Sequence, residues 1–439
     1  MADIEAMLAS LQALHPRVID LSLERVERLL DKLGRPQDRL PPVFHVAGTN
    51  GKGSTIAFLR AALEAAGNSV HVYTSPHLVR FNERIRLGAP GGGRLVGDDE
   101  LADAIGHIQR VNDGDSVTYF EATTAVALHL FAEHPADYCL LEVGLGGRYD
   151  ATNVIDAPLA ALITPVSHDH AEFLGEDLAG IAAEKAGVLK AGRPGVIGPQ
   201  DEHAMAMISV EAEAAHAPLF KYGEDWTVRA ERGRLVYEDE TGLLDLPMPK
   251  LFGDHQVPNA GLAIAALRSA EVQLPKGALE AGVVEARWPA RMQRLSSGPL
   301  VERLPADSEV WLDGGHNPAA GLVLSAAIGE LEERVPRPLV MIAAMLSTKD
   351  PAGFFQPFDG LARYVFTVPV PGSNAGIEPQ KLAEMAMDCD LPARAMESVA
   401  DAMDEIRVMF EGEQAPRVLI CGSLYLAGAV LKENGPLPD

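Results

Sequence analysis

A glycine-rich segment, AGTNGKGST at residues 47–55, holds the residues whose types and spacing best fit a chemical role. It follows an apolar run and precedes a helical pattern, and a strand, a turn and a helix in this order build a phosphate site. Its glycines let backbone N–H groups crowd an anion. Lys52 would reach the β- and γ-phosphates, and the hydroxyl of Ser54 or Thr55 could hold Mg²⁺. The segment predicts a nucleoside triphosphate site; the alternative is a turn that only connects a strand to a helix.

The spacing of this loop differs from the common GxxxxGK[ST] pattern. Two residues separate Gly48 from Gly51, and Gly53 lies between Lys52 and Ser54. The loop residues predicted to contact the nucleotide are Asn50, Gly51, Lys52, Gly53, Ser54 and Thr55.

Two further groups of polar residues follow apolar runs and are candidate metal ligands. Glu142 ends one run and precedes a glycine turn, where a carboxylate oxygen suits Mg²⁺. His168 and His170 follow another run, in the segment SHDH. The pattern alone leaves Glu142 open as a solvated loop residue and either histidine open as a structural or surface residue.

Other candidates are weaker when judged from their surroundings alone. Lys185 falls on a helical pattern, where a solvated lysine is the ordinary interpretation. Asp313 and His316, in the segment DGGHNP, follow an apolar run and precede a helix that begins with proline. They either face a ligand held between domains or form a capping turn.

The elements that must position these residues alternate between strands and helices. Apolar runs at 69–73, 138–143 and 159–163 are separated by helical patterns such as 121–133 and 178–189. This alternation predicts a mostly parallel sheet covered on both faces. Functional residues are then expected at the carboxyl ends of the strands, where the unusual motifs fall.

The second half of the chain contains a change of texture and then a second α/β unit. Residues 215–249 are rich in charges and turns and predict a small β excursion on the first domain, and a helical pattern follows at 259–270. The polar segment 295–308 is the best linker candidate. The fold class is therefore α/β, with an N-terminal P-loop-type doubly wound ATPase domain (1–296) and a smaller Rossmann-like C-terminal domain (297–439). The strands expected in the second domain are 310–313, 339–343, 364–368 and 418–421.

Composition limits the classes of function. The 439 residues carry 37 basic and 62 acidic side chains, a net charge of −25, which argues against general nucleic-acid binding. The three cysteines lie far apart, which fits buried thiols in a reducing compartment. No signal-like N-terminus and no bilayer-length apolar stretch is visible, so a cytoplasmic protein without membrane contact is expected.

Taken together, the motifs resemble the folylpolyglutamate synthase/dihydrofolate synthase family, whose relatives are the Mur ligases. The matching segments run in order along nearly the whole chain. They are IDLSLERV (19–26), GTNGKGS (48–54), TSPHL (74–78), NER (82–84), TYFE (118–121), EVGLGGRYDATN (142–153), HDHAEFLG (168–175), EKAG (184–187), DGGHNP (313–318), MLSTKD (345–350) and GSLY (422–425).

The resemblance implies roles that the residues alone left open. It implies Mg²⁺, in two sites, with Ser54, Glu142 and His170 as ligands, whereas His168 falls where the family has an apolar residue. Lys185 matches a lysine that the family carbamylates with CO₂. The further nucleotide contacts that it implies are Asn259, Arg291 and Asp313, with His316 in the same turn as Asp313. Two positions depart from the family pattern by small-for-small exchanges: Ala290 and Gly315.

The resemblance also implies a pterin site and a reaction. The matching substrate positions are Ile19, Asp20, Leu21, Ser22, Ser75, Phe120, Glu121, Ala122, Thr123, Tyr149, Asp150 and Ala151. The implied reaction joins L-glutamate to dihydropteroate, and further glutamates to reduced folates, through an acyl phosphate made from ATP. The first domain would bind ATP, Mg²⁺ and pterin, the second would serve glutamate ligation, and the chain would be a monomer with Lys52 and Lys185 as catalytic residues. The attacking amine must also lose a proton, and the candidate acceptors are His316, the third catalytic candidate, and a nearby carboxylate.

Three alternatives remain at this point. The chain could act only as a folylpolyglutamate synthase, or as a Mur-type ligase of cell-wall precursors. The TSPH and TYFE segments disfavour the Mur-type ligase because they lack counterparts there. An ATP-binding regulatory module without chemistry is the third, and the combination of Glu142, His170 and Lys185 argues against it.

Overall fold

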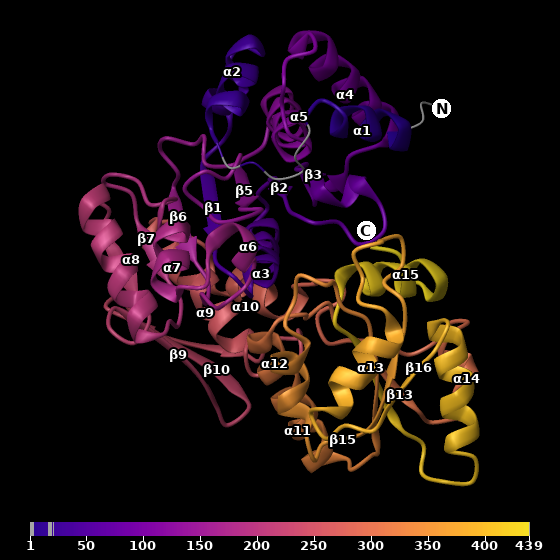
Figure 1. Cartoon of the computed structure of the whole chain (residues 1–439). Coiled ribbons are helices and arrows are strands. Elements are labelled where there is room, and N and C mark those ends of the chain that lie inside the picture. Colours follow the sequence, from indigo (N-terminus) through magenta and orange to yellow (C-terminus); the bar gives the residue numbers. More distant parts are fainter. Residues whose placement is uncertain (1–3, 16–19, 21, 439) are drawn as a thin grey trace.

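Two α/β units form the molecule, each built on its own sheet (Figure 1). The computed structural model describes residues 4–15, 20 and 22–438, so the predicted site residues Ile19 and Leu21 lie outside the described residues. Within that described part, no helix is long and apolar enough to cross a membrane.

The first unit has an eight-stranded sheet of order β4-β3-β2-β5-β1-β6-β7-β8. The strands from β2 to β8 in this order are parallel, and β3 and β4 add an antiparallel edge. Its strands are β1 (Val43–Ala47), β2 (Val70–Tyr73), β3 (Ile85–Leu87), β4 (Arg94–Leu95), β5 (Tyr138–Glu142), β6 (Ala160–Ile163), β7 (Gly195–Ile197) and β8 (Leu219–Lys221).

Helices cover both faces of this sheet, which confirms the doubly wound arrangement. On one face α3, α9 and α10 pack together, and on the other α5 lies with α2 and α4, beside α7 and α8. The central strands β1 and β5 are apolar and buried on both sides, as parallel strands between helical layers must be. The helices of this unit are α1 (Ile4–Gln12), α2 (Glu24–Lys32), α3 (Lys52–Ala65), α4 (Asp98–Asn112), α5 (Tyr119–Glu133), α6 (Ala171–Leu174), α7 (Leu178–Ala186), α8 (Glu202–Ala215), α9 (Gln256–Ser269) and α10 (Lys276–Glu285).

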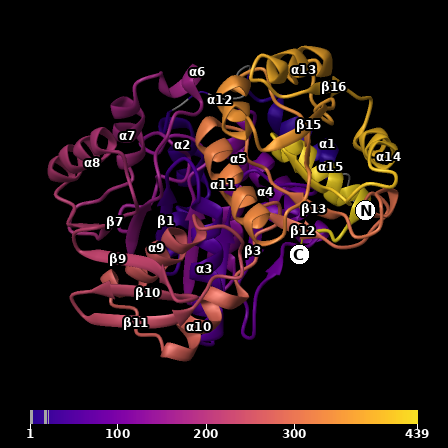
Figure 2. The same cartoon turned by 90° about the horizontal axis from the view of Figure 1, so that it is seen from below.

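The predicted β excursion is a separate three-stranded antiparallel sheet, β9 (Trp226–Glu231), β10 (Arg234–Asp239) and β11 (Gly242–Pro247). Trp226 and Val228 on β9 belong to the same buried cluster as α9, so the small sheet extends the core of the first unit. Figure 2 shows β9, β10 and β11 stacked at the edge of this unit, next to α9 and α10.

The second unit has a six-stranded sheet of order β12-β13-β17-β14-β15-β16. All neighbours in it are parallel except β12, which runs antiparallel to β13. The first residue paired in this second sheet is therefore Gln293, just before the predicted domain boundary at 296/297. The position of that boundary stays a prediction. The strands are β12 (Gln293–Leu295), β13 (Glu309–Leu312), β14 (Leu339–Ala343), β15 (Ala362–Thr367), β16 (Ala393–Ala395) and β17 (Arg417–Cys421).

Helices also cover both faces of the second sheet. The helices α11 (Pro318–Arg334), α12 (Pro351–Phe355) and α13 (Pro379–Met387) pack on one face, and α14 (Val399–Met409) and α15 (Leu424–Asn434) on the other. The Asn317 side chain caps α11 by accepting a hydrogen bond from Ala320 N, and Pro318 occupies the first turn. The DGGHNP segment therefore does form a capping turn, through Asn317, and this leaves Asp313 and His316 available to face the cleft.

The topology brings the unusual motifs together. The strands β5, β1 and β6 are neighbours, so the segments after Glu142, Ala47 and Ile163 leave the same edge of the sheet. The loops that follow β13 and β14 approach this edge from the second unit, as the hydrogen bonds between the two units show. A cleft between the units is therefore where the candidate site lies.

Candidate active site

The loop 48–51 has the tight geometry expected of a phosphate cradle. Gly48 (φ 134°) and Gly51 (φ 94°) adopt left-handed backbone conformations that favour glycine. A Cβ atom on Gly48 would lie 1.9 Å from Thr164 Oγ1, and one on Gly51 would lie 2.5 Å from Asn259 Oδ1. Helix α3 begins directly after Gly51, so its free N–H groups point into the cleft.

Lys52 lies across this loop. Its Nζ donates to the carbonyl oxygens of Gly48, at 3.1 Å, and Thr49, at 3.0 Å. Desolvation lowers the pKa of Lys52, and the negative charges of Glu142 and Asp169 oppose that shift. A cation is thus held at the loop where the phosphates of a nucleotide are expected.

Lys185 is buried instead of solvated, contrary to the ordinary interpretation of its helical pattern. Its side chain extends from α7 so that Nζ donates to Gly48 O at 3.0 Å, and the residue is 5% exposed. Burial, and next the charge of Lys52, lower the pKa of Lys185 to about 7. Lys185 is therefore partly in the neutral, nucleophilic form near neutral pH.

The three predicted metal ligands come from segments at the same edge of the sheet, at or after β5, β1 and β6. Glu142 is 5% exposed at the end of β5, and Ser54 is 2% exposed in the first turn of α3. Burial raises the pKa of Glu142, whereas the charge of Lys52 opposes that shift. His170 is the N-cap residue of α6, with a φ of 54°. Burial lowers the pKa of its ring to about 4, so the ring is neutral near neutral pH and able to bind a metal.

A small cavity of about 30 Å³ brings several of these groups together. Lys52, His170 and Lys185 line it with Asp169 and residues 143–146. Among the residues that the structure describes, no group of three or more His, Cys, Asp and Glu side chains forms a metal cluster. Mg²⁺ commonly binds one or two carboxylates and substrate phosphates, so one buried glutamate with a serine and a histidine fits it.

The loop after β5 is shaped by Asp150. Its carboxylate accepts hydrogen bonds from the N–H groups of Gly144, at 3.0 Å, Leu145, at 2.8 Å, and Thr152, at 3.0 Å. Burial raises the pKa of Asp150, and these hydrogen bonds oppose the shift. The carboxylate of Asp150 therefore holds the loop, and Tyr149 beside it is 48% exposed at the cleft.

A second cavity, of about 220 Å³ and mainly apolar, gathers most of the predicted pterin-binding residues. Those at its wall are Asp20, Ser75, Phe120, Glu121, Tyr149, Asp150 and Ala151. Ala122 and Thr123 are fully buried in α5, and Thr123 Oγ1 donates to Tyr119 O. Ser22 is partly exposed just before α2.

Glu121 has a structural function in this wall. Its carboxylate accepts hydrogen bonds from Arg25 Nη2, at 2.8 Å, and from Thr118 N, at 2.8 Å, which forms the capping box of α5. We expect Glu121→Ala to lower the free energy of unfolding by about 2 kcal/mol, because a charged hydrogen bond and a cap are lost. Urea unfolding measures this. The control Glu133→Ala, whose side chain is 52% exposed, should change it by less than about 0.5 kcal/mol, and equal losses would contradict the prediction.

The predicted nucleotide contacts Asn259, Arg291 and Asp313 lie around the junction of the two units. Asn259 is buried on α9. Its side-chain oxygen lies so close to Gly51 that a Cβ atom on Gly51 would clash with it. Asp313 accepts hydrogen bonds from Met292 N at 2.7 Å and Gly315 N at 2.6 Å. Burial raises the pKa of Asp313, and the charge of Arg291 opposes the shift.

The second unit touches the phosphate loop and Asp169 partly through Asn317 and Lys349, two side chains to which the sequence assigned no role. Asn317 and Asn50 exchange two amide hydrogen bonds, at 3.1 and 3.2 Å. Asp169 accepts hydrogen bonds from Asn317 Nδ2, at 3.1 Å, and Lys349 Nζ, and its Oδ2 lies 3.5 Å from His316 Nε2. Asp169 thus joins three residues of the second unit to the floor of the cleft.

The geometry permits phosphoryl transfer with exclusion of water. Two lysines, a buried carboxylate and a helix N-terminus surround a loop built for an anion, and a second domain closes over it. Such an arrangement stabilises developing negative charge mainly by position and electrostatics.

Comparison with known proteins agrees with this geometry. Residues 46–267 match the Mur ligase middle domain, and residues 301–433 match the dihydrofolate synthetase C-terminal domain. The dihydrofolate synthase/folylpolyglutamate synthase of Escherichia coli K12 is 34% identical over 98% of this chain and 95% of its own length. A structure of E. coli FolC with DHPP and ADP superimposes with a TM-score of 0.86 at 33% identity, covering 98% of this chain and 97% of that chain. A bifunctional folylpolyglutamate synthase/dihydrofolate synthase with Mn, AMPPNP and L-glutamate bound superimposes with a TM-score of 0.84 at 32% identity, covering 98% of both chains.

Proposed function

This chain belongs to the dihydrofolate synthase/folylpolyglutamate synthase family of ATP-dependent ligases, and from that membership we propose how its cleft works. It joins L-glutamate to dihydropteroate and extends reduced folates with further glutamates. The observation that carries this is that the apolar cavity shares Gly144, Leu145 and His170 with the small cavity at the phosphate loop, where Asn50 is hydrogen-bonded to Asn317 of the second unit.

The reaction has two steps. A substrate carboxylate oxygen attacks the γ-phosphorus of ATP, the bond to ADP breaks, and an acyl phosphate forms. The α-amine of L-glutamate then attacks the acyl carbon, phosphate leaves, and the amine gives up a proton. Lys52 and the N–H groups of the phosphate loop stabilise the charge on the transferred phosphoryl group.

We assign that proton to His316. Its Nδ1 lies 2.8 Å from Gly314 O, a carbonyl that can only accept, so Nδ1 carries a proton and Nε2 is free to exchange one. Asp169, 3.5 Å from Nε2, stabilises the imidazolium that results. The domain closure that brings His316 to the phosphate loop thus completes the site.

A family structure contains Mn together with AMPPNP, and we propose that this chain binds Mg²⁺ through Ser54, Glu142 and His170. Bound there, it would neutralise charge on the β- and γ-phosphates. The burial of Glu142, which disfavours its carboxylate form, is the feature of this chain that a cation would relieve.

We propose that Lys185 is carbamylated by CO₂, which needs a neutral amine. Because the pKa of Lys185 is about 7, part of the Lys185 population carries a neutral amine near neutral pH, and this neutral fraction grows as the pH rises through 7. With ¹³C-bicarbonate, a carbamate resonance should appear in the NMR spectrum above pH 7 and be missing in Lys185→Ala. Activity of Lys185→Ala should fall and be partly restored by small carboxylates such as acetate. Full activity without any additive would show that the carbamate is not needed.

The function is tested by phosphate release from Mg-ATP and L-glutamate, with dihydropteroate or tetrahydrofolate as the second substrate. Release with both establishes the bifunctional assignment. Release with tetrahydrofolate alone narrows it to folylpolyglutamate synthase, the name of a Lacticaseibacillus casei relative 32% identical over 92% of this chain. Release with neither would overturn the proposal. The chain should run as a monomer in light scattering.

A further inference from the structure

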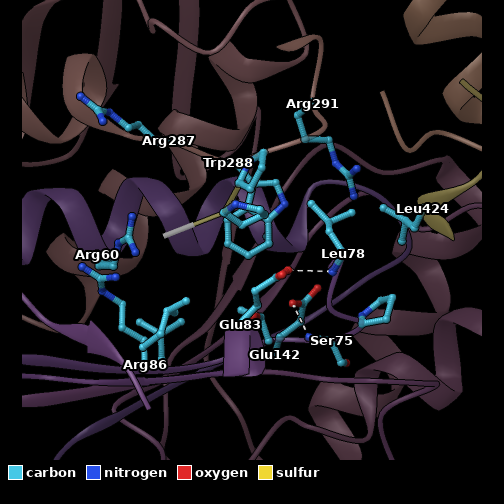
Figure 3. Close-up of a pocket in the computed structure, with 17 residues that line it drawn as sticks. Arg60, Ser75, Leu78, Glu83, Arg86, Glu142, Arg287, Trp288, Arg291 and Leu424 are labelled. Atoms are coloured by element: carbon cyan, nitrogen blue, oxygen red, sulfur yellow. Dashed lines mark hydrogen bonds between the residues drawn. The ribbon is translucent and has the colours of Figure 1, made fainter. Parts of the chain in front are cut away.

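A third cavity, of about 270 Å³, lies between the two units and is rich in arginine (Figure 3). Gly53 of the phosphate loop and Glu142 are at its wall, so it opens onto the place where the acyl phosphate is proposed to form. Ser75 and Pro76 line both this cavity and the apolar one, which makes the two cavities neighbours.

Three arginines of this cavity, Arg60, Arg86 and Arg287, form what we call the arginine cluster. Arg60 comes from α3, Arg86 from β3 and Arg287 from the segment after α10. Figure 3 shows the guanidinium groups of Arg60 and Arg86 next to each other. Both pair with the Glu64 carboxylate: Arg60 Nε lies 3.9 Å from Oε2, and Arg86 Nε lies 3.7 Å from Oε1. Arg287 is exposed at the rim and makes no ion pair with any residue that the structure describes.

Charge is distributed unevenly around this cavity. The whole chain carries −25, yet among the residues that the structure describes four arginines, the cluster and Arg291, line the wall against two carboxylates, and Glu64 behind the wall pairs with Arg60 and Arg86. One of the two wall carboxylates, Glu83, already accepts hydrogen bonds from the N–H groups of Leu78, at 2.7 Å, and Val79, at 2.9 Å. The other, Glu142, lies at the catalytic end. The arginine cluster therefore offers an excess of positive charge in an otherwise acidic protein, which favours an anionic ligand.

We propose that the arginine cluster binds the α-carboxylates of the γ-glutamyl tail of folate substrates. This rests on the proposed function. Each γ-linked glutamate carries one free α-carboxylate, whereas dihydropteroate has no tail. When the terminal γ-carboxylate is at Glu142 and the phosphate loop, the preceding residues of the tail must leave the catalytic centre. The cavity lined by Trp288 and these arginines provides that path, and Figure 3 shows Arg60 and Arg86 together to one side of Trp288, with Arg287 set apart from them. Guanidinium groups pair with carboxylates by two parallel hydrogen bonds.

The test compares two substrates in the same variant. The measured quantity is the ratio of kcat/KM for tetrahydropteroyl triglutamate to kcat/KM for dihydropteroate. Each of three substitutions should lower this ratio about tenfold, because one charged hydrogen bond to the tail is lost. The substitutions are Arg60→Gln, Arg86→Gln and Arg287→Gln. Arg287→Gln is the most informative variant because its side chain is exposed and its replacement disturbs no ion pair of the described structure. Arg39→Gln, whose side chain is 51% exposed on η1 (Pro36–Arg39), is the matched control and should leave the ratio as it is.

Binding without turnover separates this proposal from the proposed function. A γ-linked triglutamate peptide should change the fluorescence of Trp288 in the unaltered chain, and about tenfold more peptide should be needed in each cluster variant. If neither pterin is ligated but this shift is seen, the function fails and the tail site stands. If all three variants keep the ratio of kcat/KM values of the unaltered chain, the tail site is overturned. A rise in KM for ATP with this ratio unchanged would also overturn it, because the cluster would then bind the nucleotide.

Discussion

Replacing Lys52 by alanine is expected to lower kcat for glutamate ligation about a thousandfold, since one preorganised charge donor at a phosphoryl group typically contributes a hundred- to a thousandfold. The cation lies on the phosphate loop, with Nζ 3.1 Å from Gly48 O, and no other described lysine except Lys185 donates to this loop. Phosphate release in the presence of saturating Mg-ATP, L-glutamate and dihydropteroate measures the loss.

The fold should survive this change. Lys52 donates only to carbonyls of its own loop, and desolvation already disfavours its charged form, so the alanine variant should keep its unfolding temperature within a few degrees. Lys276→Ala, on the exposed face of α10, is the matched control and should retain full activity. Turnover of Lys52→Ala within tenfold of the unaltered chain would show that Lys52 does not stabilise the transferred phosphoryl group.

The sequence was sufficient for features that are local in the chain. The strand, glycine turn and helix of the phosphate loop could be predicted because its glycines, its lysine and the start of α3 are contiguous, and the structure shows this turn, with positive φ angles at Gly48 and Gly51. The alternation of apolar runs and helical patterns likewise predicted both parallel sheets, because strands buried on both faces must be apolar. Short edge strands such as β4, with two residues, give no such signal.

The sequence was insufficient for contacts between distant segments. Lys185 lies on an ordinary helical pattern, and only the packing of α7 beneath the phosphate loop removes it from water and lowers its pKa. The family resemblance, not the pattern, indicated its role. Asn50 and Asn317 are 267 residues apart, and no periodicity links them. The arginine cluster is also invisible locally, because its three residues come from three different elements.

Asp169→Ala should weaken the contact between the two units, and it is the second large effect that we expect. Lys349 and Asp169 are each 8% exposed, so the substitution leaves a buried ammonium group without its counter-charge. Loss of one partner of a buried pair costs about 3–5 kcal/mol. Urea unfolding should show this loss. Activity should fall as well, because Asp169 also holds Asn317, at 3.1 Å, and lies beside His316.

The pH dependence of this contribution has a definite sign. Although burial opposes the shift, the hydrogen bond and charge of His316, with the charge of Lys349, hold the pKa of Asp169 below its usual range. A carboxyl group with a lowered pKa stabilises the folded state above its unfolded pKa of about 4 and loses that contribution as the pH falls further. The difference in stability between the unaltered chain and Asp169→Ala should therefore be constant from neutral pH to about pH 5 and shrink in stronger acid.

A double variant separates stability from catalysis in this contact. Lys349→Met removes the orphaned charge with a side chain of similar length, and uncharged replacements of buried pairs are often neutral in stability. Asp169→Ala with Lys349→Met should therefore regain most of the lost free energy of unfolding but not the activity, because Asn317 and His316 remain without their partner. Recovery of both would show that Asp169 only balances the charge of Lys349. Recovery of stability alone establishes that Asp169 positions the second unit for the reaction.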